Sequence, residues 1–391
     1  MDGGTALVRG VAPLYLAGFV TAFGAHGVAS VLGAESDDIG LSLLGLGAAL
    51  ALYDVAEVLL KPLFGALSDR IGAKPVIVGG LIAFAVASAL ALLSPTPLVL
   101  ALARLGQGAA ASAFSPASSA AVARIAGRER LGRYFGRYGA WKSLGYVAGP
   151  LLGVALVSLW GIQALYIALG LLAAGAAVWV AVALPRLPVV PRPRYTLADL
   201  VRQTTERGFL VPTLLLATTT AVLGVAVGFL PLLATRLGLP PIVGAAAVAV
   251  LALVSMAMQP VVGRLRDRER ITTRVGGFVG LSVAAAALGV LALAPHAVTL
   301  FAAALAIGFM TGTVTPLAFA HLAAVTPEER MGRTMGNAEL GRELGDAGGP
   351  LLVGGVATAA TLPIALGLLA VLSLVAGATG WRVLRPTDER L

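Results

Sequence analysis

The chain has 391 residues, of which 58% are hydrophobic and only 12% are charged. Soluble domains carry about 25% charged residues, so this composition excludes a soluble enzyme and a secreted domain. The absence of cysteine also excludes disulfides, thiolate metal sites and a catalytic thiol. We expect no cofactor and no metal. The net charge of +9 is explained better by membrane topology than by nucleic-acid binding.

Long apolar runs follow one another along almost the whole chain. A helix that crosses a bilayer needs about 20 mostly apolar residues. Twelve runs meet this requirement, at residues 11–32, 41–67, 75–93, 97–125, 131–159, 162–184, 209–237, 241–265, 272–293, 297–325, 331–360 and 362–383. We therefore predict an all-α integral membrane protein with twelve transmembrane helices, and not an enzyme.

The Lys and Arg residues outside these runs predict the orientation of the chain. With the N-terminus in the cytoplasm, the inner segments hold nearly all of these bases, whereas the outer side has only Arg236, next to the end of the seventh run. The positive-inside rule then places both termini in the cytoplasm. High Ala, Gly and Arg usage is typical of a bacterium with GC-rich DNA. The predicted location is thus the bacterial inner membrane.

The sequence repeats itself at about half its length. ERLGRYFGRYGAWKSLGYVAGPLL, from Glu129, parallels ERMGRTMGNAELGRELGDAGGPLL, from Glu329, and KPLFGALSDR, from Lys61, parallels QPVVGRLRDR, from Gln259. These matches predict two parallel six-helix bundles, at residues 1–184 and 209–391, joined by a cytoplasmic linker at 185–208. Such repeats are a transporter architecture, with a binding site between the halves.

The loop after the second run carries a motif at Gly65, Asp69, Arg70, Gly72 and Lys74. It resembles the Gly-x3-Asp-Arg-x-Gly-x-Lys/Arg signature of the major facilitator superfamily, and the resemblance extends over the whole chain. Gly65 would permit close helix approach, and Asp69 would lie at the positive N-terminal end of a neighbouring helix. The resemblance implies a latch that holds the inner gate shut; a topological charge cluster is the alternative.

Two further motifs resemble the same family. Arg104 and Gln107 match its Arg-x-x-Gln-Gly motif, whose Arg faces the central cavity and aids proton transfer; a buried Arg bonded to carbonyls is the alternative. The fifth run matches a motif of proton-coupled efflux antiporters. We expect its glycines to form a dry seam between the halves, although the eleventh run repeats the pattern and a packing role in both halves stays open. The residues of this motif are Gly145, Gly149, Pro150 and Gly153.

Charged residues inside the apolar runs are costly unless they are paired or hydrated. We expect Glu57 to pair with Lys61, and Arg342 to pair with Glu339 or Glu343. Our hypothesis is a proton-switched lock between the halves, in which carboxylates pair with Lys142 or Arg342 and protonation releases them; a static network is the alternative. The residues assigned to proton coupling are Asp54, Glu57, Arg104, Lys142, Arg342, Glu343 and Asp346.

In the family, the first, fourth, seventh and tenth helices of the chain line the cavity. Here these runs contain no Asp or Glu, which favours neutral, lipophilic or anionic substrates. Candidate cavity residues are His26, Tyr53, Gln107 and Trp141. The predicted function is export of small drug-like molecules in exchange for protons, by a monomer. A proton-coupled importer or facilitator on the same fold is the alternative, and a membrane enzyme or channel is a third.

Overall fold

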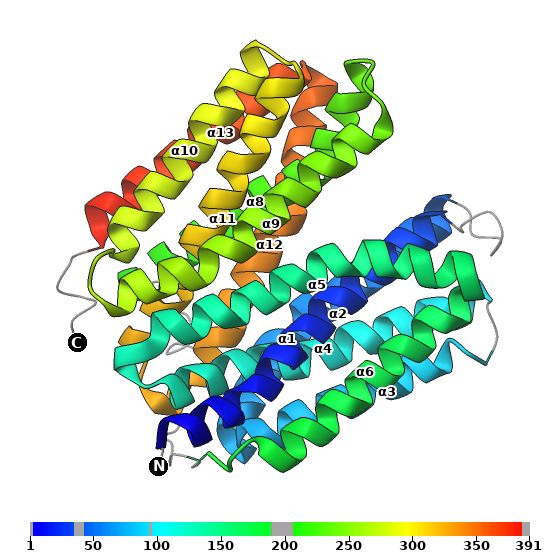
Figure 1. Ribbon diagram of the computed structural model, residues 1–391, viewed down its shortest axis with the longest axis vertical. Helices are drawn as coiled ribbons and strands as arrows, with labels where there is room; N and C mark the ends of the chain where they lie inside the picture. Colours follow the sequence, from blue (N-terminus) through cyan, green and yellow to red (C-terminus); the bar gives the residue numbers. More distant parts are fainter. Residues whose placement is uncertain (1–2, 35–42, 94–95, 188, 190–205, 385–391) are drawn as a thin grey trace. The chain divides into compact units, whose positions relative to one another are not determined.

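A computed structural model of the protein describes residues 3–34, 43–93, 96–187, 189 and 206–384 (Figure 1). Within these ranges the chain is helical and has no strand, so the all-α prediction is confirmed there. Most of the predicted linker at 185–208 lies outside them. Long helices occupy the predicted runs: α1 (Gly3–Ala34), α2 (Leu43–Ile71), α3 (Ala73–Leu90), α4 (Pro97–Ala126), α5 (Leu131–Trp160), α6 (Ile162–Ala183), α8 (Arg207–Arg236), α9 (Pro241–Asp267), α10 (Thr273–Leu293), α11 (Ala297–Val325), α12 (Met331–Ala359) and α13 (Leu362–Val383).

Ten helices of the described chain are long and apolar enough to cross a membrane. The two long helices outside this set are α2 and α12, which carry all the Asp and Glu residues of the predicted runs. Each has 29 residues, a length of about 43 Å at 1.5 Å per residue, which exceeds the hydrocarbon core of a bilayer. A layout of twelve spans therefore stays a prediction, and α2 and α12 are the helices on which it depends.

The chain divides into two compact units that do not follow the two halves of the sequence. The first comprises residues 1–126, 141–191 and 327–340, and the second comprises 127–140, 192–326 and 341–391. The helices α5 and α12 thus each contribute one part to either unit. The bundle boundaries expected from the repeat, 1–184 and 209–391, remain a prediction.

In each unit one helix has a long segment that is buried on all sides. In the first unit α4 packs against α1, α2 and α3, and residues 110–123 of α4 are all buried. In the second unit α11 packs against α8, α9 and α10 and is buried in the same way (Figure 1). The buried part of α4 consists mainly of Ala and Ser, whose small side chains allow several helices to approach it at once.

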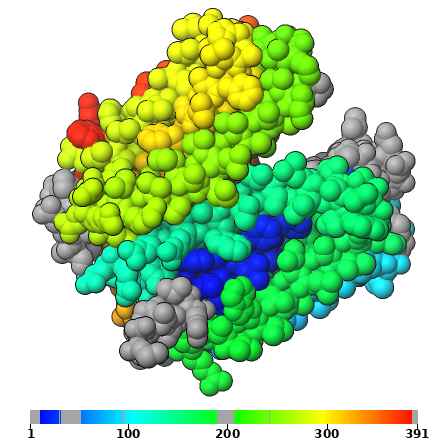
Figure 2. Space-filling model, viewed as in Figure 1, coloured from blue at the N-terminus to red at the C-terminus, as the bar shows by residue number. Residues whose placement is uncertain are grey.

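The outer helices present large apolar side chains to the surroundings. Val86 of α3 is 64% exposed, Val182 of α6 is 80% exposed and Val371 of α13 is 55% exposed. Such a surface fits a lipid environment. In Figure 2 a strip of α1 (blue) is visible between α5 and α6 (teal and green), and α1 also contacts α4.

Gly72 separates α2 from α3 by adopting a φ of 93°, a conformation that side chains strain against. This glycine belongs to the predicted loop motif, which explains why the two helices turn so tightly at that point. The turn places the end of α2 and the start of α3 side by side, next to the end of α6. There the Lys74 ammonium donates to the Leu184 carbonyl oxygen at 2.7 Å.

Candidate functional site

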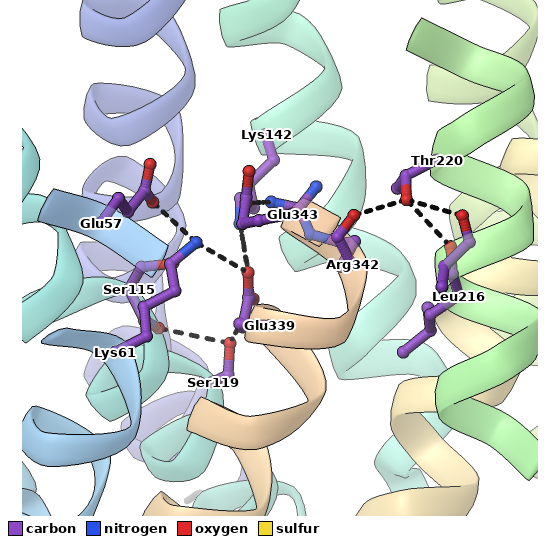
Figure 3. A network of polar contacts seen from close by, with 11 residues as sticks. Glu57, Lys61, Ser115, Ser119, Lys142, Leu216, Thr220, Glu339, Arg342 and Glu343 are labelled. Carbon is purple, nitrogen blue, oxygen red and sulfur yellow. Dashed lines mark hydrogen bonds and ion pairs between the residues drawn. The ribbon is translucent and has the colours of Figure 1, made fainter. Parts of the chain in front are cut away.

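A group of buried charged side chains lies within the first unit (Figure 3). Lys61 of α2 binds Glu57, one turn earlier, at 2.7 Å, and its Nζ lies 3.8 Å from a carboxylate oxygen of Glu339 on α12. Lys142 of α5 lies 3.4 Å from the same oxygen. The Ser119 hydroxyl of α4 donates to the other Glu339 oxygen at 3.3 Å. We call these five residues the Glu339 network.

The Glu339 network is sealed from solvent and has no net charge. The exposed fractions of its side chains are 0% for Lys61, 6% for Glu57, 1% for Glu339 and 9% for Lys142. Two carboxylates balance two ammonium groups, which limits the cost of burying them at this depth. Glu339 is the member that connects the helices, because its partners lie on α2, α4 and α5.

The expected pairing inside the helices is confirmed. Glu57 pairs with Lys61, as the spacing of four residues predicts. In the second unit Arg342 binds Glu343 at 2.6 Å, whereas Glu339 binds the two lysines instead. The Thr220 hydroxyl of α8 donates to the Arg342 carbonyl oxygen at 2.6 Å. Sequence reasoning omitted Glu339 and Ser119 from the candidate site. The repeat offers a signal for Glu339, because the corresponding position in the first half of the sequence is Gly139 and carries no acid.

The other residues assigned to proton coupling make different contacts. Asp54 is exposed on α2, and Asp346 of α12 is half-buried against Gly224 of α8. Arg104 of α4 is 1% exposed, and its guanidinium carbon lies 4.2 Å from the centre of the Tyr53 ring. Within the described residues its Nε and Nη1 have no hydrogen-bond acceptor, its guanidinium stacks on Tyr53, and the carboxylates of Asp54 and Glu57 are near enough to stabilise its charge.

The loop motif binds the N-terminus of α12. The Asp69 carboxylate accepts hydrogen bonds from the amides of Gly332 at 2.7 Å and Arg333 at 2.9 Å, and it pairs with Arg124 of α4 at 2.8 Å. A Cβ at Gly65 would lie 2.5 Å from the Gly332 carbonyl oxygen. The expectations for Gly65 and Asp69 are therefore confirmed.

The two bases of the loop motif differ in their contacts. Arg70 is exposed. Lys74 binds the carbonyl oxygen of Leu184, the residue that directly follows α6, and not α12. It satisfies one of the carbonyl groups that a helix end leaves without a partner. Lys74 therefore joins α3 to α6, whereas Asp69 joins α2 to α12.

The second unit contains a copy of the Asp69 contact. The Asp267 carboxylate at the end of α9 accepts from the amides of Gly132 and Arg133, both at 2.8 Å. These amides open α5, just as those of Gly332 and Arg333 open α12. A Cβ at Gly263 would collide with the Gly132 carbonyl. A carboxylate at the positive end of a helix is favourable, and here it is also hydrogen-bonded twice.

The glycines of the predicted antiporter motif pack α5 against α1. A Cβ at Gly145 would lie 2.7 Å from the Phe19 carbonyl oxygen, and one at Gly149 would lie 2.9 Å from the Gly27 amide nitrogen. A Cβ at Gly153 would lie 3.1 Å from the Gly27 carbonyl oxygen. The expected seam between the halves of the sequence is thus wrong for these glycines, because α1 belongs to the same half. Gly349 of α12 packs against Ala221 of α8 in the second unit, so the pattern serves packing twice. Pro150 lies inside α5, which continues through it.

The four candidate cavity residues have different surroundings. Tyr53 and Gln107 are fully buried, and the Gln107 side-chain amide donates to Ser88 at 2.9 Å. His26 of α1 stacks edge-on to Tyr146 of α5 at 4.5 Å. Trp141 is 42% exposed and contacts Phe19 edge-on. Their role in substrate binding therefore stays a prediction. Within the described residues no three metal-ligating side chains come together.

Comparisons with known proteins give a consistent picture. A sequence model of the family described as Major Facilitator Superfamily matches residues 14–294. A chloramphenicol resistance protein of Pseudomonas aeruginosa is 44% identical over 122 residues, 30% of this chain and 29% of that protein. A multidrug resistance protein B homolog of Mycobacterium tuberculosis (strain H37Rv) is 36% identical over 109 residues, 28% of this chain and 20% of that protein. These matches thus span less than a third of either relative.

The fold resembles that of a solved transporter. The structure of FucP in the outward conformation superposes with a TM-score of 0.80 at 15% identity, covering 97% of this chain and all of that one. At this identity the likeness concerns the fold alone.

Proposed function

Because the family match covers most of its length, the chain belongs to the Major Facilitator Superfamily, and we propose that it exports small, drug-like molecules in exchange for protons. The two relatives are named for resistance to chloramphenicol and to multiple drugs, which favours export over import. The observation that carries proton coupling is the Glu339 network. Buried charges inside membrane helices are typical of ion and proton pathways.

The proposed transport cycle uses two parallel six-helix bundles that rock against each other. The matching surroundings of α4 and α11 support this repeat. Asp69 at the start of α12 and Asp267 at the start of α5 would hold the inner ends of the helices together, and their release would open the inner side. We propose a monomer in the bacterial inner membrane, with both termini in the cytoplasm.

The test measures chloramphenicol accumulation in a bacterial host that lacks its own drug exporters. Cells that produce the protein should accumulate less chloramphenicol than cells with an empty vector, and an uncoupler should abolish the difference. In everted vesicles, addition of the drug to energised membranes should release protons from the lumen. Export would be contradicted if producing cells and empty-vector cells accumulated equal amounts of chloramphenicol and of every other lipophilic drug tried.

The second candidate is a proton-coupled importer or facilitator of a small metabolite. It is favoured by the absence of acids from the presumed cavity helices, because an exporter of cationic drugs would gain from an acid there. The direction of the proton signal in oriented vesicles separates the two functions. Symport moves protons and substrate the same way, whereas antiport moves them in opposite directions.

A further inference from the structure

Three residues of the Glu339 network, Glu57, Lys61 and Glu339, have neutral counterparts in the same molecule, whereas the counterpart of Lys142 is Arg342, which pairs with Glu343. Offsets of 198 and 200 residues relate Lys61 to Gln259 and Glu339 to Gly139. In the second unit the Gln259 amide donates to Ser255 at 3.2 Å, in the place of the Lys61–Glu57 pair, and its side-chain oxygen fills the space above Gly139. The backbone contacts agree as well, since Gly336 packs on the Lys61 carbonyl and Gly136 on the Gln259 carbonyl.

This comparison separates packing from charge. The same crossing of helices forms with a neutral Gln–Ser pair over a glycine, so the fold does not require charged residues at this place. Buried charges are costly, and well-packed neutral residues are often as stable. The charges at Lys61 and Glu339 therefore serve something other than the assembly of the helices.

Glu339 and Glu57 differ in whether they keep their ion-pair partners when a helix moves. Glu57 and its partner Lys61 lie on one helix, so this pair survives any displacement of α2. The partners of Glu339 lie on α2, α4 and α5, and they are lost together when the start of α12 moves away. A carboxylate that loses its partners inside the membrane must take up a proton or be hydrated. Its protonation is thus linked to the position of α12.

We infer that Glu339 is the proton-binding residue of this transporter, and that its protonation releases Lys61 and Lys142 and lets the first turns of α12 separate from α2, α4 and α5. The step is a simple proton transfer, in which a proton from the aqueous phase forms an O–H bond on the carboxylate. Among the described residues, the charged groups next to Glu339 include Glu57 and Lys61 from α2 and Lys142 from α5, and α4 contributes the Ser119 hydroxyl. On α12 itself, Arg342 and Glu343 follow and pair with each other. The inference rests on the proposed proton coupling.

The test uses the absence of cysteine from the chain. Met335 lies one turn before Glu339 and is completely buried, so Met335→Cys reports whether this part of α12 is exposed. The rate of alkylation by N-ethylmaleimide is measured in purified full-length protein between about pH 8 and about pH 5. In this pH window a buried carboxylate can change its protonation state. Each rate is divided by that of Arg268→Cys, which is exposed and corrects for ionisation of the thiol.

With Glu339 intact, the corrected rate should rise as the pH falls. Glu339→Gln should make the corrected rate high and independent of pH, whereas Ser255→Ala, at the repeat-related position of Glu57, should keep the pH dependence. A pH dependence that persists in Glu339→Gln would overturn the inference, as would a flat profile with Glu339 intact. No substrate is needed, so the result is independent of whether the chloramphenicol assay supports export.

A second variant keeps the inference testable if Glu339→Gln does not fold. Lys142→Met retains Glu339 but removes one of its two ammonium partners. The midpoint of the alkylation profile should then move upward by about one pH unit or more, because an adjacent opposite charge favours the ionised carboxylate by 1–3 units. An unchanged midpoint in Lys142→Met contradicts the inference. Glu339→Asp, which keeps a carboxylate, should retain a pH-dependent rate.

Discussion

At the scale of single residues, two aspartates do similar work with different numbers of partners. Asp69 and Asp267 each accept two backbone amides at the start of a helix. Asp69 also pairs with Arg124, whose side chain is only 8% exposed. The two positions are related by the repeat, so each serves as the control for the other.

We predict that Asp69→Asn destabilises the protein more than Asp267→Asn. A charge at a helix N-terminus contributes about 0.3–1 kcal/mol, and Asn loses that share at either site. At Asp69 the substitution also leaves the buried Arg124 without its carboxylate, which costs about 3–5 kcal/mol in comparable buried pairs. The measurement is the midpoint of thermal unfolding in detergent. Equal losses in the two variants would show that the Arg124 pair contributes nothing.

The residue scale also shows which contacts sequence reasoning could reach. Glu57 and Lys61 were predictable, because a spacing of four residues on one helix fixes their proximity. Lys142 and Glu339 are 197 residues apart, and their contact depends on how two separate helices are rotated. Hydropathy says little about the rotation of α12, because its charges and glycines occur on several faces. For the same reason the sequence left open whether Arg342 pairs with Glu339 or with Glu343, and the structure shows the pair with Glu343.

At the scale of elements, glycines set the distance between helices. Gly65 brings α2 against the first turn of α12, and its missing side chain is what makes room for the Gly332 carbonyl. Gly79 of α3 offers the opposite case, because a Cβ there would meet no atom within 4 Å. Gly65 is thus needed for the close contact between α2 and α12, whereas Gly79 is not needed for any helix contact in the described residues.

We predict that Gly65→Ala lowers the stability of the protein and that Gly79→Ala does not. The added methyl at position 65 overpacks a close helix contact, which typically costs about 1–3 kcal/mol. Alanine at position 79 should stabilise α3 by roughly 0.5–1 kcal/mol, because glycine is a poor helix former. The fraction of protein that remains monodisperse after heating in detergent measures both. A Gly65→Ala variant as stable as the wild type would mean that α12 is not held closely to α2.

The helices themselves were predictable, and their neighbours were less so. Each apolar run became a helix because a bilayer leaves backbone groups no other partners. The direction of the α5 glycines could not be read from the sequence, since a smooth helix face fits any close neighbour. The structure assigns these glycines to α1, a contact between segments of the same half. The resemblance to an antiporter motif thus described a packing surface correctly but misplaced its partner.

At the scale of the whole molecule, the distribution of bases predicts which loops share a side of the membrane. The turns after Ala126 and after Asp267 belong to the side rich in arginine, whereas Gly161 and His296 lie at the opposite ends of neighbouring helices. Placing the arginine-rich side in the cytoplasm follows from the cost of moving these charges across the bilayer.

We predict that single cysteines at Arg128 and Arg268 react with a membrane-impermeant maleimide only from the cytoplasmic side. Both positions are exposed in turns between helices. A cysteine at His296 should react only from outside. The chain has no cysteine of its own, so intact cells and everted vesicles give a clean comparison. Labelling of Arg128→Cys in intact cells would reverse the proposed orientation.

The long separation of Glu339 from Lys142 has a consequence for how the protein is made. Ribosomes add about 5–20 residues per second, so the 197 residues between the two take about 10–40 s to synthesise. During that interval Lys142 has already reached the membrane, and the carboxylate that will bind it does not yet exist. A nascent chain that stalls before α12 therefore leaves an ammonium group without its Glu339 counter-charge, a defect by which quality-control proteases could distinguish it from a finished transporter.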